Sequence, residues 1–291
     1  MKYIKKFDTL SGQTEYLNSA DIDTYVGYVD ENQTVYYDDS IIIQYQKKYL
    51  TIEALTAGDL SLTGARSNFN YSLDNGSTWN VLANNQTVAV NAGKKVLLKA
   101  NRPTVYYETG IGNISYSGQF NLYGNIMSLV YGDNFIGQET ISDGYQFYKL
   151  FRSNTTLISA ENLILPATTL KNVCYMSMFN GCTSLTVAPV LPATSLMFGC
   201  YWSMFYNCTS LTTAPELPAT ILAGSCYKAM FAGCRNLNYI KCLATDISAS
   251  DSTQNWVQNV AASGTFVKAS GMNDWTTGIN GIPTGWTIEN E

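Results

Sequence analysis

The sequence predicts a mixed α/β protein of several domains. A small N-terminal α+β module and a β-sandwich precede a solenoid of 26-residue strand–helix repeats. Three observations predict this architecture. A segment with two cysteines occurs three times at a constant offset of 26 residues. The stretch before it alternates short apolar runs with turn residues, as the strands of a sandwich do. The chain has 291 residues, of which 46% are hydrophobic and 13% charged, so it can bury a sizeable core.

Residues 1–47 are expected to form a separate small module. The run SGQTEYLNSAD predicts a short helix, and DTYVGYVDENQTVYYDD predicts a hairpin of two strands joined by a polar turn. A core this small is marginal by itself. We therefore expect the module to dock on a partner or a neighbouring chain, and so to anchor the protein and make it a homo-oligomer.

Residues 48–134 predict the β-sandwich. They contain SLDNGSTW, which matches the Asp-box pattern S-x-D-x-G-x-T-W of sialidases. Asp74 is expected to bind turn amides, Gly76 to take a positive φ, and Trp79 to pin the hairpin to the core. The box occurs once and only Arg66 and Arg102 lie in this region, so a structural hairpin is favoured over a sialidase site.

Residues 135–262 contain the repeat. Its central copy, CYWSMFYNCTSLTTAPELPATIL, begins at Cys200. The apolar positions i, i+1, i+4, i+5 and i+8 predict one stripe of a short helix, and the following Thr-Ser-Leu-Thr segment predicts a strand. One strand and one helix in 26 residues are typical of a leucine-rich-repeat-like solenoid. About five related segments are expected, one with two extra residues. Residues 263–291 are expected to cap the last turn through Trp275, Ile282 and Trp286.

The cysteines stand in two columns of the repeat. Residues eight apart in a helix are separated by roughly 12 Å, whereas a disulfide requires Cα atoms within about 7 Å. The two cysteines of one repeat therefore do not pair with each other, and pairing between adjacent turns stays open. The spacing does not suit zinc, and we expect buried thiols that serve packing. The six positions are Cys174, Cys182, Cys200, Cys208, Cys226 and Cys234.

The composition argues against several functions. The chain has no histidine, which excludes the Ser-His-Asp triad, the Cys-His dyad and the common metal sites. It has no phosphate-binding or dinucleotide-binding glycine motif. We expect no enzyme activity, no cofactor and no metal. The net charge of −5 argues against a nucleic-acid partner, and no apolar run is long enough for membrane insertion.

What remains is a binding surface. Positions that differ between the repeats are expected to be exposed, and aromatic side chains there can stack on a sugar or anchor a protein contact. The alternative is that these side chains pack on a neighbouring turn or domain. The candidate ligand-binding residues are Trp202, Tyr206, Thr186, Thr212 and Asn238.

The repeat at Cys200 resembles the BspA-like leucine-rich repeats of surface and phage-encoded proteins of gut Bacteroidales, over about residues 145–262. The C-terminal GIPTGWTI is similar to the ending that often follows such repeats. The N-terminal KFDTLSGQTEYLNSADIDTYVGYVDENQTVYYDD resembles the leader of virion-associated proteins of Bacteroides phages and prophages. The resemblance implies a non-enzymatic protein of attachment and transfers no catalytic residue.

Two functions follow from this resemblance. A bacterial surface adhesin is expected to carry a signal peptide or lipobox, and the sequence shows neither. This favours a phage head or tail fibre or capsid decoration, located in the virion. Residues 1–47 are expected to bind other virion proteins, and the repeats a host-surface protein or glycan. The alternative is the ectodomain of a bacterial cell-surface adhesin.

Overall fold

The computed structural model describes residues 2–7, 14–16, 27–29, 35–37, 48–107 and 109–291. The chain divides into two compact units, Met1–Lys47 and Lys48–Glu291. The first unit contains an antiparallel sheet with the strand order β2-β1-β3-β4. Its strands are β1 (Lys2–Phe7), β2 (Thr14–Tyr16), β3 (Gly27–Val29) and β4 (Val35–Tyr37).

Two predictions fall within this first unit. The segment expected to be a short helix contains strand β2, so its described part is a strand and not a helix. The two runs expected to form a hairpin contain β3 and β4, which pair antiparallel. The remaining residues of both segments lie outside the described residues.

The second unit corrects the predicted fold class. In the part of the chain that the structure describes, one α-helix is present, α2 (Ser128–Tyr131), followed by the short 3-10 helix η2 (Gly132–Asn134). The regular secondary structure of the described residues is therefore nearly all β. The mixed α/β class and the solenoid of strand–helix repeats are wrong.

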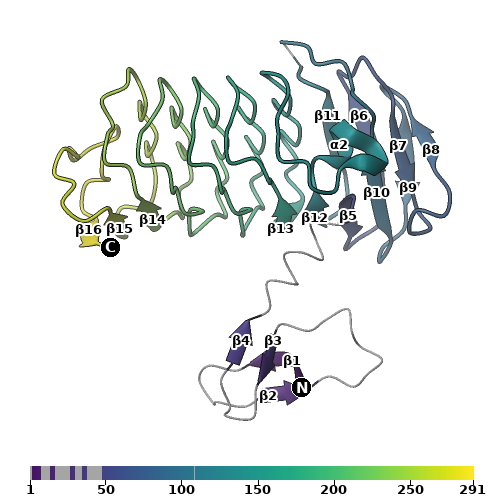
Figure 1. Cartoon of the computed structure of the whole chain (residues 1–291), viewed down its shortest axis with the longest axis horizontal. Coiled ribbons are helices and arrows are strands. Elements are labelled where there is room, and N and C mark those ends of the chain that lie inside the picture. The colour runs from purple at the N-terminus through teal and green to yellow at the C-terminus, as the bar shows by residue number, and fades with distance from the viewer. Residues whose placement is uncertain (1, 8–13, 17–26, 30–34, 38–47, 108) are drawn as a thin grey trace. The chain divides into compact units, whose positions relative to one another are not determined.

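Two sheets form the first half of this unit (Figure 1). Their strand orders are β13-β12-β5-β10-β7-β8 and β11-β6-β9. Along their strands, buried and more exposed side chains alternate. β10 buries Val96 and Leu98 between exposed or half-buried neighbours, and β6 buries Leu60 and Leu62 in the same way. Both sheets contribute to one hydrophobic core. The strands are β5 (Leu50–Ala54), β6 (Gly58–Thr63), β7 (Phe69–Ser72), β8 (Asn80–Leu82), β9 (Thr87–Val90), β10 (Lys95–Lys99), β11 (Asn113–Tyr116), β12 (Phe120–Asn125) and β13 (Leu157–Ile164).

The segments predicted to be helices are ribbons of consecutive β-turns. Alternate N–H groups donate to the carbonyl three residues earlier, as from Met178 to Tyr175 at 3.2 Å. An α-helix instead bonds every residue to the fourth before it and has no positive φ. In the ribbon a positive φ recurs at every fourth residue, for example at Val173, Ser177 and Gly181. Five such turn ribbons lie at residues 145–154, 173–182, 199–208, 225–234 and 251–260.

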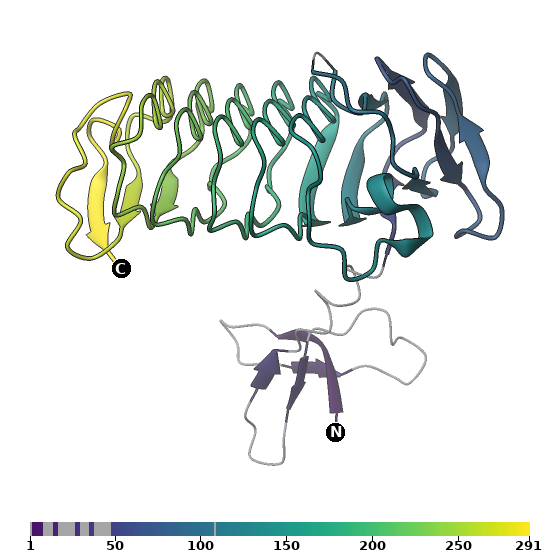
Figure 2. The same cartoon turned by 45° about the horizontal axis from the view of Figure 1, so that its top comes forward.

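The ribbons are stacked, and we call residues 145–260 the turn stack (Figure 2). The N–H groups that are not used within a ribbon donate to the next one, as from Phe179 to the Met204 carbonyl at 2.9 Å. Buried aromatic rings form two ladders along the stack, with centroids 5.6 to 6.1 Å apart in near-parallel planes. The first ladder contains Phe147, Tyr175, Tyr201 and Tyr227, and the second contains Phe151, Phe179, Phe205 and Phe231.

The segments between ribbons were expected to be strands, and they differ from one turn to the next. The first contains β13, which pairs parallel with β12 and includes the two extra residues of that repeat. The next two make only isolated bridges. Proline has no N–H to donate to a neighbouring strand, and four prolines in these two segments explain why no continuous strand forms there. They are Pro189, Pro192, Pro215 and Pro218. The stack ends in a parallel sheet of β14 (Tyr239–Cys242), β15 (Thr265–Lys268) and β16 (Thr287–Asn290).

The C-terminal residues pack against the last ribbon. Trp275 stacks on Trp256 with 5.5 Å between ring centroids. The indole N–H of Trp286 donates to the Ala261 carbonyl at 2.8 Å, and Ile282 is buried. These three side chains therefore cover apolar surface at the end of the stack.

Candidate functional site

The structure places Trp202 on the third ribbon, with one ring face already occupied. The Lys228 ammonium lies 4.8 Å from the centroid of the Trp202 ring, and Asp251 lies 3.9 Å from the same ammonium. Trp202 is half-buried. It therefore takes part in contacts between successive turns, and only part of its ring is available to a ligand.

The other candidate ligand residues are more exposed. Tyr206 has 37% of its surface accessible and lies four residues after Trp202 on the same ribbon. Thr186, Thr212 and Asn238 are exposed at equivalent positions of successive repeats. Their backbone joins neighbouring turns, as Asn238 N–H donates to the Thr212 carbonyl at 2.9 Å. The structure thus brings the five residues into two groups, an aromatic pair on the ribbon and a polar column beyond its end.

Exposed apolar side chains are concentrated on the middle turns. Six of the thirteen large hydrophobic side chains that are exposed in the described residues lie between positions 187 and 221. We call these six the middle-turn surface: Val187, Val190, Met197, Phe198, Tyr206 and Ile221. Of these six residues, only Tyr206 was predicted from the sequence as a ligand-binding candidate. A signal was present, because Phe198 stands where the other repeats have Asn172, Gly224 and Ser250.

A groove of about 460 Å³ lies beside Val190. It is lined by the proline-containing segments of two successive turns, residues 188–192 and 215–218. At one side Lys241 forms ion pairs with Glu216 at 3.1 Å and with Glu291 at 2.7 Å. The hydrogen bonds that Lys241 donates to the carboxylates of Glu291 and Glu216 raise the pKa of Lys241 above its ordinary value. The groove is apolar at its centre and charged at this rim.

The cysteines of the repeat are free thiols inside the turn stack, and so is Cys242. Three of them donate a short hydrogen bond from Sγ to a carbonyl of the preceding ribbon, at 3.0 to 3.2 Å. These pairs are Cys182 with Phe151, Cys208 with Phe179, and Cys234 with Phe205. Burial raises the pKa of Cys182 and of Cys234 to about 12. Packing and a weak hydrogen bond account for a cysteine at this position.

We expect all seven thiols to be reduced and slow to react. Labelling of the native protein should be slow because the thiols are buried and the reactive thiolate is disfavoured. Labelling after denaturation should count seven thiols. Cys208→Ala should lower the free energy of unfolding by about 1–3 kcal/mol through a cavity. Mass spectrometry that finds three intact disulfides would contradict this prediction.

The Asp box forms a closed hydrogen-bonded turn. Asp74 accepts from the Thr78 hydroxyl at 2.6 Å, the Thr78 N–H at 2.9 Å and the Ser72 hydroxyl at 2.7 Å. Ser72 Oγ in turn accepts from the N–H of Gly76, whose φ is +89°. The hydrogen bonds from Thr78 are the main cause that lowers the pKa of Asp74 to about 2. The structure therefore gives Asp74 and Gly76 turn-forming contacts.

These contacts predict an acid-dependent loss of stability. The pKa of Asp74 is depressed by folding, so its contribution is present above the ordinary value of 3.8 and is lost as the pH falls toward about 2. Asp74→Ala should lower the unfolding midpoint at neutral pH and should flatten its decline between about pH 4 and pH 2. Asp274→Ala, at an exposed aspartate near the C-terminus, is the control. An unchanged pH profile in Asp74→Ala would contradict this role.

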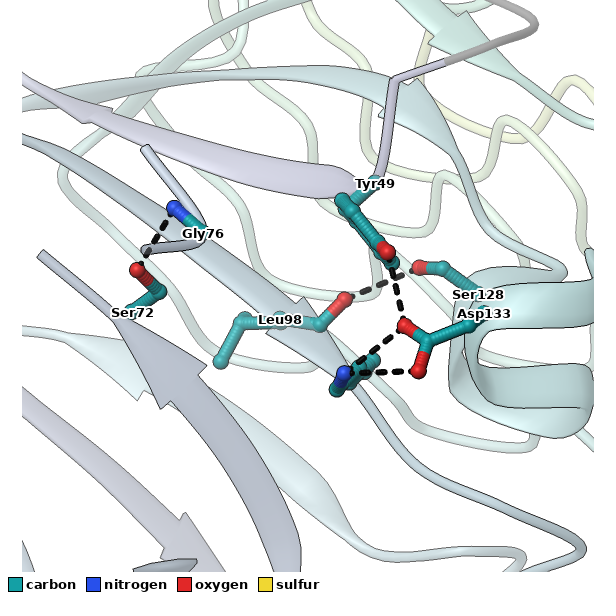
Figure 3. A network of polar contacts seen from close by, with 7 residues as sticks. Tyr49, Ser72, Gly76, Leu98, Ser128 and Asp133 are labelled. Atoms are coloured by element: carbon teal, nitrogen blue, oxygen red, sulfur yellow. Dashed lines mark hydrogen bonds and ion pairs between the residues drawn. The ribbon is translucent and has the colours of Figure 1, made fainter. Parts of the chain in front are cut away.

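A second polar cluster, at the start of this unit, contains Tyr49 and Asp133 (Figure 3). Tyr49 donates to Asp133 at 2.7 Å, and Lys99 donates to both oxygens of the same carboxylate at 2.7 and 3.0 Å. The Lys99 ammonium lies 4.0 Å from the ring centroid of Trp79, which also contacts the Tyr49 ring at 5.0 Å. Burial, reinforced by Asp133, raises the pKa of Tyr49 to about 12. Trp79 thus connects the Asp-box hairpin to the hydrogen-bonded cluster of Tyr49, Lys99 and Asp133.

Buried serine provides a further link in the same region. Ser128 Oγ donates to the Leu98 carbonyl at 2.9 Å (Figure 3). It also accepts from the Leu50 N–H at 2.9 Å. These bonds hold α2 against β10 and β5. The buried hydroxyl of Ser128 therefore has a structural role.

Among the described residues, no group of three or more His, Cys, Asp or Glu side chains is arranged to hold a metal ion. None of the helices in the same residues has the length and apolar character needed to cross a bilayer.

Comparisons with protein-family models, with curated proteins and with solved structures found no match. The assignment of a function therefore depends on the surface chemistry of this chain.

Proposed function

We propose that this chain is a non-enzymatic virion structural protein of a bacteriophage, such as a head or tail fibre or a capsid decoration. It presents the turn stack for attachment to a host-surface protein or glycan. The observation that carries the proposal is the concentration of exposed apolar side chains on the middle-turn surface. Exposed apolar side chains that gather on one part of a protein are typical of interaction sites.

The chemistry of the middle-turn surface suits such a contact. Phe198 is 52% exposed and Ile221 is 65% exposed, so both side chains are available to a partner. The rings of Tyr206 and, in part, Trp202 provide aromatic surface of the type that anchors protein and sugar contacts. Tyr206 stands on a ribbon that backbone bonds and an aromatic ladder join to its neighbours, so a contact through Tyr206 costs little backbone entropy.

The first unit is proposed to anchor the protein. Residues 1–47 form a compact unit of their own, and residues 48–291 have a separate core. This division allows one part to bind other virion proteins, as a homo-oligomer, while the other contacts the host. Many copies on one particle would convert weak single contacts into strong attachment.

Substitution of the middle-turn surface tests the attachment role. The double variant Phe198→Ser/Ile221→Ser should still assemble into particles, because both side chains are exposed. It should reduce particle attachment to host cells by about tenfold through the loss of apolar contacts. Val81→Ser is the matched control, since Val81 is an exposed apolar residue of β8 outside this surface. Equal attachment by the double variant and the control would refute the assigned surface.

Deletion of residues 1–47 tests the anchoring role in the same assay. The shortened chain should fold, because residues 48–291 contain their own core, but it should be missing from purified virions. Normal incorporation would assign assembly to another part of the chain. Mass spectrometry of purified virions that lacks the full chain would favour the bacterial adhesin instead.

A further inference from the structure

A second cleft lies where the smaller sheet meets the first turn ribbon. Its volume is about 380 Å³, within the range of about 300–1,000 Å³ that is usual for small-molecule sites. Three segments that are distant in sequence supply its walls: the end of β6, the start of β11 with the residues before it, and the first ribbon. Six polar residues line it: Thr63, Thr109, Asn113, Lys149, Arg152 and Ser153. The cleft is separate from the middle-turn surface.

The cleft is rich in unused hydrogen-bond donors. Within the described residues, neither Lys149 nor Arg152 forms an ion pair with a carboxylate. The hydroxyl groups of Thr63, Thr109 and Ser153 also have no hydrogen-bond partner in that part of the chain. Among the described residues that line the cleft there is no carboxylate. The cleft thus contains two cations that have no carboxylate partner among the described residues, in a chain whose net charge is −5.

The backbone that carries these donors is fixed. The side-chain amide of Asn113 donates to the Lys149 carbonyl at 2.7 Å and to the Arg152 carbonyl at 3.1 Å. The N–H of Ser153 donates to the Asn180 carbonyl of the next ribbon at 2.8 Å. The Lys149 ammonium lies 4.4 Å from the centroid of the Tyr148 ring. The backbone from which these donors extend is therefore ordered before any ligand arrives, which lowers part of the cost of binding.

We infer that this cleft binds the oxyanion of a charged sugar. Arg152 suits the two oxygens of a carboxylate or phosphate, and Lys149 adds a second positive charge. The three hydroxyl groups can donate to further oxygens of the anion or of the sugar. Asn113 Oδ1 accepts no bond from the described residues, so it can accept from a sugar hydroxyl. An acidic sugar and a phosphorylated sugar share this chemistry.

Calorimetric titration of the full-length protein with three matched sugars tests the inference. The probes are glucuronic acid, glucose 6-phosphate and glucose, in low and high salt. We expect at least one anionic sugar to bind, with weaker binding at high salt, and glucose not to bind. The anionic sugar that binds identifies the carboxylate or the phosphate as the source of the oxyanion. Absence of binding by both, or equal binding of glucose, would overturn the inference.

Two charge-removing variants locate the site. Arg152→Gln and Lys149→Gln should each weaken binding of the anionic sugar by about fivefold or more, because each removes a charged donor. Arg235→Gln is the matched control, since Arg235 is an exposed arginine outside the cleft and the change in net charge is the same. Arg152 is itself exposed, so its variant should keep the wild-type unfolding midpoint. Equal affinity in Arg152→Gln and Arg235→Gln would show that the cleft is not the site.

Discussion

Phe205→Ala is expected to lower the free energy of unfolding by about 3–5 kcal/mol, the largest effect of any substitution considered for the turn stack. The Phe205 side chain is fully buried. Its ring stacks on Phe179 at 5.6 Å and on Phe231 at 5.8 Å, with planes within 5° of parallel. Alanine removes both contacts at once and leaves a cavity between ribbons whose backbone is fixed by bonds in both directions. The structure has little freedom to collapse into that cavity.

Denaturant unfolding measures this effect, and the adjacent residue supplies the control. Tyr206 lies on the same ribbon but is exposed, so Tyr206→Ala should change the free energy of unfolding by about 0.5 kcal/mol or less. Phe205→Leu should fall between the two because it retains part of the buried volume. If Phe205→Ala and Tyr206→Ala cost the same, the ladder does not stabilise the stack as described.

The 26-residue period was predictable from sequence, whereas the local structure of each repeat was not. The apolar positions of CYWSMFYNC recur every four residues, and an α-helix recurs every 3.6. Over eight residues the difference is small, so the pattern also fits one helical stripe. A second signal distinguishes the turn ribbon: the residues with positive φ are mostly small or tolerant of that conformation, such as Ser203, Asn207 and Gly233. In an α-helix every residue has a negative φ, so residues that tolerate a positive φ are not required there.

The distance in sequence between contacting residues explains which features of the candidate sites could be predicted. The Asp box is a local motif, and the hydrogen bonds of Asp74 follow from residues within four positions of it. The cleft depends on three distant segments, and no pattern along the sequence brings Thr63 near Arg152. The contact of Lys228 with Trp202 depends on the offset between turns. Only a correct repeat geometry could have predicted that part of the Trp202 ring is covered.

A glycine in β12 shows how closely two strands approach at the start of the second unit. Gly124 has a φ of +83°, and a Cβ at this position would collide with the carbonyl oxygen of Tyr49. It would also lie 2.9 Å from the Tyr49 carbonyl carbon and 3.1 Å from the Lys48 oxygen. These are backbone atoms, and the chain here is held by the bond from Asn125 N–H to the Lys48 carbonyl at 2.8 Å. Neither side can move without breaking the pairing.

Gly124→Ala is therefore expected to lower the free energy of unfolding by about 3 kcal/mol, from backbone strain and from the collision together. Displacement of Tyr49 should also weaken its hydrogen bond to Asp133 and so destabilise the cluster that these two residues form with Lys99. Gly93→Ala is the matched control, because Gly93 has a φ of +76° but nothing within 4 Å of an added Cβ. That control should cost only the strain of a positive φ, about 1 kcal/mol. The difference between the two variants in denaturant unfolding measures the close approach of β12 to Tyr49, and equal costs would mean that this approach is not as tight as the structure has it.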